Sequence, residues 1–173
     1  MESETVSMLC NPYTRGALRL VEASNSDGIR TEFLEDVQTG EKFPFHNGIP
    51  VLYDASRLEG YNLQYNEFYR RTARFYDPAL KTLAVLTGGR ESKFRKQFLR
   101  LLELRQDSKV LEVSVGTGTN LSLLPENIHG YGLDLSWDML SQCQKNAARW
   151  NRKFELFYGN AEELPFRDEM FDV

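Results

Sequence analysis

The sequence predicts an α/β fold for the C-terminal part of the chain, with a small β module before it. From residue 109 onward, short apolar runs at 110–115, 131–135 and 154–158 alternate with a glycine turn and with helical periodicity. Strands separated by helices of this length form parallel βαβ units. Before residue 55, turn-forming residues separate short β-branched and aromatic runs, which is typical of strands. A chain of 173 residues has room for a small module and part of a larger domain.

Residues 1–54 form the expected β module. Strands are expected at 17–22, 29–34 and 43–53, and the turn cluster at 25–28 (NSDG) can join the first two as a hairpin. The core of so small a module is thin, so we expect the module to pack on the C-terminal part of the chain.

Residues 55–104 form the second region, which is expected to be helical. The aromatic segment at 61–76 is typical of a helix that packs on a neighbouring domain. Near the end of the region, apolar residues recur at a helical period and basic residues take the other face. The apolar positions are Phe94, Phe98, Leu101 and Leu102.

Residues 105–173 form the third region, which carries the predicted parallel sheet. A helix is expected between the second and third strands, with Ser136 as its N-cap. Its apolar stripe consists of Met139, Leu140, Cys143, Ala147 and Trp150. Residues 171–173 are expected to begin a fourth strand.

The composition disfavours several classes of function. With 21 basic and 25 acidic side chains, the net charge is -4. This charge argues against a strongly basic surface that binds nucleic acid or an anionic membrane. Two cysteines and two histidines are too few for a disulfide framework or a four-ligand zinc site, so we expect no metal. We see neither a signal-peptide pattern nor an apolar run of about 20 residues, and we expect a cytoplasmic location.

A ligand-binding crevice is predicted at the carboxyl edge of the parallel sheet. Gly116 and Gly118 come after the first strand, where glycines allow a tight turn and a close approach of a ligand to the backbone. Asp134 lies 18 residues after Gly116, at the end of the next strand. A carboxylate in that place can accept hydrogen bonds from both hydroxyl groups of a ribose.

The residues around the turn favour a cationic ligand over a dinucleotide. The dinucleotide fingerprint requires a small residue where this chain has Leu121. Glu112, just before the turn, is a poor neighbour for a pyrophosphate and a good one for a sulfonium and an ammonium group. S-adenosylmethionine carries both cationic groups. The alternative for Glu112 is a solvated carboxylate at the end of a strand.

Three motifs in order carry a resemblance to a known family. Residues 110–120 (VLEVSVGTGTN), 131–136 (YGLDLS) and 159–166 (GNAEELPF), with 171–173 (FDV) after them, resemble the motifs of class I S-adenosylmethionine-dependent methyltransferases. The branch that includes the ubiquinone and menaquinone biosynthesis enzymes is the most similar. The resemblance implies a Rossmann-like parallel sheet that is incomplete in this chain, because only three strands and the opening of a fourth are present.

The resemblance also implies which residues contact the cofactor. Ser114 departs from the family by replacing its usual first glycine, and Asn160 departs by replacing its usual aspartate. The implied positions are Glu112, Val113, Ser114, Gly116 and Gly118 at the methionine part, Asp134 at the ribose, Leu135 and Met139 beside the adenine, Asn160 and Ala161 at the adenine edge, and Tyr76 closing over the methionine end.

The N-terminal module resembles a second family. Residues 43–52 (FPFHNGIPVL) are similar to the signature of small zinc-ribbon proteins that activate methyltransferases. Aligned on that signature, Asn11, Thr14, Asp36 and Thr39 occupy the four positions where the family has zinc-binding cysteines. The resemblance therefore implies a zinc ribbon without its metal.

The leading hypothesis is an S-adenosylmethionine-dependent methyltransferase, or its cofactor-binding half. The alternative is a non-catalytic, truncated relative that acts as a scaffold or regulator of another chain. A third hypothesis, an NAD-dependent oxidoreductase, is weakened by Leu121 and Glu112. The sequence assigns neither catalytic residues nor a methyl acceptor. Because the first strand would lie near an open sheet edge, a second copy or a partner chain is expected to cover that edge.

Overall fold

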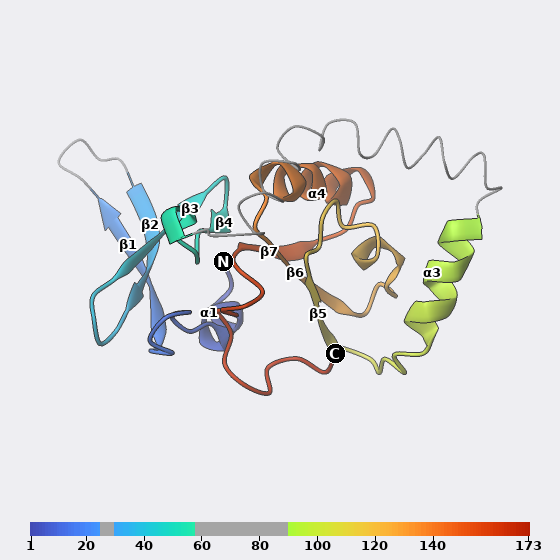
Figure 1. The fold of residues 1–173 in the computed structure, drawn as a ribbon, viewed down its shortest axis with the longest axis horizontal. Helices are drawn as coiled ribbons and strands as arrows, with labels where there is room; N and C mark the ends of the chain where they lie inside the picture. The colour runs from blue at the N-terminus through green and yellow to red at the C-terminus, as the bar shows by residue number, and fades with distance from the viewer. Residues whose placement is uncertain (25–29, 58–89) are drawn as a thin grey trace.

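The computed structural model describes residues 1–24, 30–57 and 90–173, and Figure 1 shows their arrangement. A four-stranded sheet near the N-terminus lies beside a three-stranded sheet formed by the C-terminal part. The described part of the chain holds no helix with the length and apolar character needed to cross a membrane.

The N-terminal sheet is antiparallel, with the strands in sequence order. It contains β1 (Leu18–Ser24), β2 (Arg30–Asp36), β3 (Lys42–His46) and β4 (Ile49–Pro50). The predicted hairpin is confirmed, since β1 and β2 pair along their whole length. A short helix, α1 (Ser3–Met8), precedes the sheet and was not predicted.

The expected single strand at 43–53 is wrong, because the chain reverses in its middle. Asn47 and Gly48 both have positive φ, at 50° and 78°. This backbone matches the right-handed twist of a tight hairpin, and Asn-Gly is the dipeptide that adopts it most easily. The turn therefore separates β3 from β4, which pair as His46 with Ile49 and Phe45 with Pro50.

The C-terminal sheet is parallel, as the sequence predicts. Its strands are β5 (Lys109–Val113), β6 (His129–Asp134) and β7 (Phe154–Tyr158), in that order. β5 ends at Val113 instead of residue 115, because Ser114 turns the chain with φ 57°.

The helix between β6 and β7 is also confirmed. α4 (Trp137–Arg149) begins after Ser136, whose side chain accepts a hydrogen bond from the Met139 N–H at 3.4 Å. Met139, Leu140, Cys143 and Ala147 are buried against the sheet, as the stripe predicts. Trp150 comes just after the end of the helix and is 39% exposed.

The glycine turn after β5 opens only a single 3-10 turn, η2 (Leu121–Leu123), and no α-helix is described between β5 and β6. Leu124 is extended, with ψ 148°, and Pro125 is the next residue. A residue before proline avoids the helical region, which ends the turn at this point. Leu121 and Leu124 are buried, so apolar side chains still cover the sheet here.

The outer edge of β5 is hydrogen-bonded to the last residues of the chain. Val173 donates from its N–H to the Lys109 carbonyl at 3.4 Å, and its carbonyl accepts from the Leu111 N–H at 2.9 Å. This pattern is that of a parallel pair centred on Val110. Residues 172–173 thus lie on the side of β5 that faces away from β6, and the expected open edge is occupied along these residues.

Two hydrophobic clusters each contain residues of both the N-terminal and the C-terminal parts, which fits the expectation that the thin N-terminal module packs on the C-terminal part of the chain. Val51 forms a parallel bridge with Tyr158, and the Leu52 N–H donates to the Tyr158 carbonyl at 2.8 Å. Leu9 pairs with Phe166 in a second bridge between the two parts. The N-terminal module is therefore hydrogen-bonded to the end of β7, although the two sheets remain separate.

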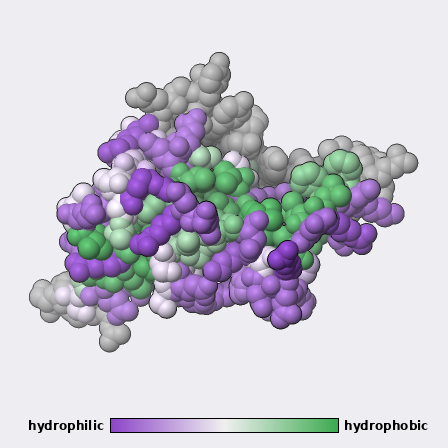
Figure 2. Space-filling model, turned by 90° about the horizontal axis from the view of Figure 1, so that it is seen from below, coloured by the Kyte–Doolittle hydropathy of each residue, from purple (hydrophilic) through white to green (hydrophobic). Residues whose placement is uncertain are grey.

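The expected apolar stripe at the end of the second region lies on α3 (Arg90–Arg100) and just beyond it. Phe94, Phe98 and Leu101 are 72%, 60% and 73% exposed, whereas Leu99 packs against the core. Figure 2 shows apolar side chains gathered between hydrophilic ones on the face seen from below. The aromatic segment at 61–76, with Tyr76, lies outside the described residues.

The four positions aligned with zinc ligands come together in a hydrogen-bonded cluster, which we call the Asp36 cluster. Asp36 is 1% exposed, and its carboxylate accepts from Asn11 Nδ2 at 2.7 Å and from Thr14 Oγ1 at 2.8 Å. Its other oxygen accepts from the N–H groups of Gln38 and Thr39 at 2.8 and 3.0 Å. Within the described ranges, no three metal-ligating side chains gather. Hydrogen bonds therefore connect the two turns that carry these residues.

The Asp36 cluster predicts a pH-dependent stability. Burial opposes ionisation, but the N–H groups of Thr39 and Gln38 and the side chains of Thr14 and Asn11 lower the pKa of Asp36 to about 2. Its contribution is therefore complete above the unfolded pKa of about 3.9 and is lost as the pH falls through about 2. Asp36→Asn should lower the free energy of unfolding at pH 7 by about 2 kcal/mol, measured by urea titration.

The loss should shrink as the pH is lowered from 4 toward 2, because wild-type Asp36 then becomes protonated. Glu32→Gln is the matched control, since Glu32 is exposed on the same strand and should change stability by less than about 0.5 kcal/mol. Equal effects of the two substitutions would contradict the role of the Asp36 cluster.

Candidate functional site

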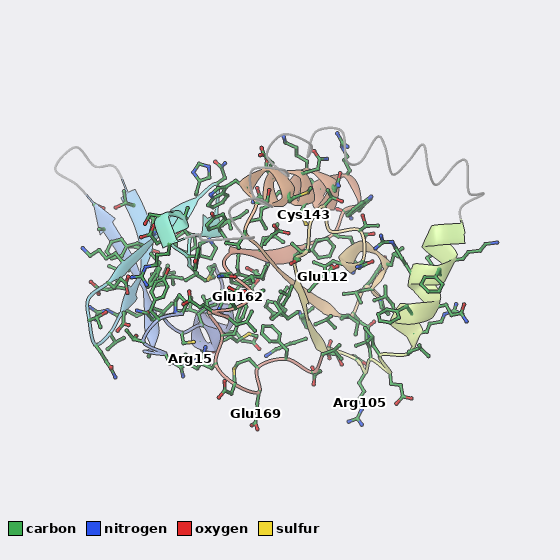
Figure 3. The ribbon with its side chains drawn as sticks, in the orientation of Figure 1. Arg15, Arg105, Glu112, Cys143, Glu162 and Glu169 are labelled. Carbon is green, nitrogen blue, oxygen red and sulfur yellow. The ribbon has the colours of Figure 1, made fainter. Side chains whose placement is uncertain are left out.

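The carboxyl ends of the three parallel strands bring the predicted site residues together. Glu112 lies near the end of β5, Asp134 ends β6, and Asn160 lies two residues beyond β7. Figure 3 shows Glu112 among the central strands and Cys143 on α4 above it. These residues thus lie at the sheet edge where the ligand crevice is predicted.

The two glycines of the turn have different roles. Gly116 has φ 56°, and a Cβ added to it would meet nothing nearer than the Ser114 carbonyl at 4.0 Å. A Cβ on Gly118, which has φ 79°, would lie 2.5 Å from Cys143 Sγ. Gly116 therefore leaves space open beside the backbone, whereas Gly118 lets α4 pack closely against the turn.

Ser114 adopts the backbone that suits the glycine it replaces. Its φ of 57° lies in the left-handed region, and its side chain is exposed. A non-glycine residue in this region costs roughly 1 kcal/mol. The turn therefore forms despite the substitution, at a small cost in stability.

Glu112 is the most unusual polar group of the site. Its Oε1 accepts a hydrogen bond from Asn120 Nδ2 at 2.6 Å. Its Oε2 is buried and has no hydrogen-bond partner among the described residues. Burial raises the pKa of this carboxyl, and the Asn120 side chain, the Leu121 N–H and the charge of Arg95 only partly offset the increase. The alternative of a solvated strand-end carboxylate is therefore wrong.

Asp134 shapes the glycine turn. Its Oδ2 accepts from the Gly116 N–H at 2.7 Å, and its Oδ1 accepts from the Ser136 N–H at 2.9 Å. Burial raises the pKa of Asp134, while the N–H groups of Gly116, Ser136 and Leu135 act in the opposite direction. A carboxylate has about four acceptor sites, so these contacts still leave capacity for a hydroxyl donor of a ligand.

The residues expected around the adenine differ in accessibility. Asn160 is 5% exposed, and its Oδ1 accepts from the Glu162 N–H at 3.1 Å. With the oxygen engaged, its amide NH2 is the group suited to a ligand. Leu135 is half-buried, Ala161 is exposed, and Met139 is 3% exposed near the start of α4. Val113, the remaining predicted position, is 39% exposed.

The N-terminal module holds the loop after Asn160, a contact that the sequence did not predict. Arg15 donates to the carbonyl oxygens of Leu164 and Phe166 at 2.8 and 2.7 Å. The Cys10 N–H donates to the Pro165 carbonyl at 3.0 Å. The resemblance to methyltransferase activators could have suggested this contact, but no local pattern marks Arg15.

Asn120 and Arg95 were not predicted as site residues either. Asn120 bonds to both Glu112 and Arg95, although the sequence gives it no role beyond membership of the first motif. A cavity of about 350 Å³ lies at the opposite end of the sheet, lined by residues such as His129 and Lys153. None of the predicted site residues lines this cavity.

Comparisons with known proteins agree with this geometry. Residues 110–173 match a family model described as a methyltransferase domain. This region is therefore similar to a methyltransferase domain, and the predicted Rossmann-like parallel sheet is confirmed.

Curated relatives match over about half of the chain. The demethylmenaquinone methyltransferase of Bacillus cereus (strain ATCC 10987 / NRS 248) is 37% identical over 94 residues, which is 51% of this chain and 40% of the relative. That of Bacillus mycoides (strain KBAB4) is 36% identical over 94 residues, with the same coverage. This chain thus spans less than half the length of these relatives.

A solved structure shows a partial likeness. The S-adenosylmethionine-dependent methyltransferase from Clostridium acetobutylicum ATCC 824 is 21% identical, with a TM-score of 0.42 over 60% of this chain and 41% of that one.

The buried Glu112 oxygen predicts a cost in stability. Because the folded protein raises the pKa of Glu112, the fold is destabilised as the pH rises through that pKa. Glu112→Gln should therefore raise the free energy of unfolding at pH 8 by about 1 kcal/mol. The gain should disappear near pH 4, where wild-type Glu112 is protonated.

Thermal unfolding at pH 4, 6 and 8 measures this difference. Glu103→Gln, at an exposed position, is the control and should leave Tm unchanged at each pH. A lower Tm for Glu112→Gln at pH 8 would show that the carboxylate stabilises the unliganded fold, contrary to this account.

Proposed function

We propose that this chain binds S-adenosylmethionine at the carboxyl edge of the parallel sheet and takes part in methyl transfer. The observation that carries the proposal is the buried Oε2 of Glu112, which has no hydrogen-bond partner within the described part of the chain. The turn that follows Glu112 leaves space open at Gly116. The match of residues 110–173 to a methyltransferase domain supports the same function. An anion that lacks a partner in the protein is suited to a cationic ligand.

The residues present fit the parts of this cofactor. Glu112 would hold the ammonium group, directly or through a water molecule. Asp134 retains acceptor capacity for the ribose hydroxyls after its bonds to the backbone. Leu135 and Met139 would flank the adenine, and Asn160 would donate to its edge. The hydrogen-bonding groups at the site therefore match the parts of the cofactor, which supports the proposal.

The sulfonium of the bound cofactor supplies an electrophilic methyl group. The site residues of this chain bind and orient, and none of them is assigned as a general base. Methyl transfer depends strongly on the alignment of the nucleophile with the methyl–sulfur bond, so positioning alone can supply much of the rate enhancement. The turn at Gly116 would leave the methionine part accessible from the open side.

An NAD-dependent oxidoreductase is disfavoured by the same geometry. Leu121 occupies the place of the small residue that lets a pyrophosphate-binding helix approach the strand, and it is buried. Only a 3-10 turn comes after the glycines and before β6, so a long helix does not point its N-terminus at the site. The anionic Glu112 would also repel a pyrophosphate.

The proposal extends to the branch of the family and to the N-terminal module. The Bacillus relatives are named for demethylmenaquinone, and their similarity supports an acceptor related to that compound.

The hairpin at 43–52 and the Asp36 cluster support a zinc ribbon that folds without zinc. The exposed apolar side chains of α3 support coverage of that face by a second copy or a partner chain.

Calorimetric titration with S-adenosylhomocysteine tests the proposal, with NADH as the control ligand. We expect micromolar binding of the first ligand and none of the second. Asp134→Ala should raise the Kd at least tenfold, because about 1.4 kcal/mol of charge-assisted hydrogen bonding is lost. Asp138→Ala, an exposed neighbour on α4, should leave the Kd unchanged.

A folded chain that binds neither ligand would contradict the proposed cofactor site. An unchanged Kd in a folded Asp134→Ala variant would remove Asp134 from that site. Binding of NADH would favour the oxidoreductase instead.

A further inference from the structure

We propose that Asn120 and Arg95 are positioning residues that hold the Glu112 carboxylate toward the amino group of the cofactor. The inference rests on the proposed function and adds two residues to which the motifs assign no role. We call these three side chains the Glu112 relay.

The relay connects three elements of the chain. Arg95 Nη1, on α3, donates to Asn120 Oδ1 at 2.6 Å. Asn120 Nδ2, at the start of η2, donates to Glu112 Oε1 at 2.6 Å. The Asn120 amide group therefore joins α3, β5 and the turn that follows β5.

The chemistry of the two end groups fixes the orientation of this amide. A guanidinium can only donate hydrogen bonds, and a carboxylate can only accept them. The Asn120 oxygen must therefore face Arg95, and its nitrogen must face Glu112. Aspartate, serine or alanine at position 120 could not make both contacts in this way.

The relay leaves one carboxylate oxygen for a ligand. Because Asn120 engages Oε1, the carboxyl group is fixed in rotation and Oε2 remains buried without a partner in the described part of the chain. A hydrogen bond to a charged group is stronger than a neutral one and holds its geometry well. The positive charge of Arg95, one amide away, also favours the ionised form of Glu112 without occupying Oε2.

A purely structural role for the relay makes a different prediction. If the three side chains only connected α3 to the turn, their loss would weaken every ligand of the crevice by the same factor. If they position Glu112 for the amino group, only ligands that carry the amino group should be affected. Two adenosine thioethers separate these possibilities.

The experiment compares S-adenosylhomocysteine with 5′-methylthioadenosine, which shares the adenosine and the thioether but lacks the amino acid group. Asn120→Ala should raise the Kd of S-adenosylhomocysteine about tenfold and that of methylthioadenosine less than about twofold. Arg95→Met, which keeps a long side chain without the charge, should act in the same direction with a smaller effect. The double variant should lose less than the product of the two single effects, because both act through Glu112.

Lys96→Met is the matched control for Arg95→Met. Lys96 is exposed on the same helix, and the described residues of the relay make no hydrogen bond to it. This variant should bind both ligands as the wild type does. Circular dichroism and Tm establish that each variant is folded.

Equal losses for both ligands in Asn120→Ala would overturn the positioning role and leave the relay as a structural connection. Unchanged binding of both ligands would also overturn it, since Glu112 would then act without the relay. A folded wild type that binds neither ligand would instead contradict the proposed function, and the inference would fall with it.

Discussion

The hydrogen bond from the Gly116 N–H to the Asp134 carboxylate is the interaction on which the site depends. At 2.7 Å, it joins the turn after β5 to the end of β6, so the positions of the two strand ends are fixed relative to each other. Ser114 tolerates a left-handed backbone to reach this turn, and Gly118 lets Cys143 pack against it. With the turn in this position, a Cβ on Gly116 would meet no described atom nearer than the Ser114 carbonyl at 4.0 Å, so the space there stays open.

Glu112 lowers the stability of the unliganded fold and, under the proposed function, binds the ligand. A buried carboxylate oxygen without a partner among the described residues is unfavourable in the unliganded protein, and an apolar or amide side chain would be more stable there. Asn120, which itself accepts from Arg95, donates to one Glu112 oxygen and leaves the other. The N-terminal module supports the opposite end of the site, because Arg15 holds the carbonyl groups of Leu164 and Phe166. The module and the parallel sheet are thus parts of one structure.

The sequence predicted the elements with strong periodicity and missed those set by tertiary contacts. β7 and α4 were found because their apolar patterns are clear, with Ser136 as the N-cap. The Asn47-Gly48 reversal was missed although the dipeptide is a hairpin signal, because apolar residues continue on both sides of it. The positions of Glu112 and Asp134 were predicted from their places on strands. The burial of Oε2 and the contacts of Asn120 could not be, since they depend on packing between residues distant in sequence.

A crystal structure of this chain with S-adenosylhomocysteine tests the central claim most directly. The account predicts that Glu112 Oε2 contacts the ligand's amino group, directly or through one water molecule, while Oε1 keeps its bond to Asn120. The adenosine should lie over Leu135, with its ribose hydroxyls on Asp134. A bound ligand whose amino group lies away from Glu112, with Oε2 still unpartnered, would contradict the account.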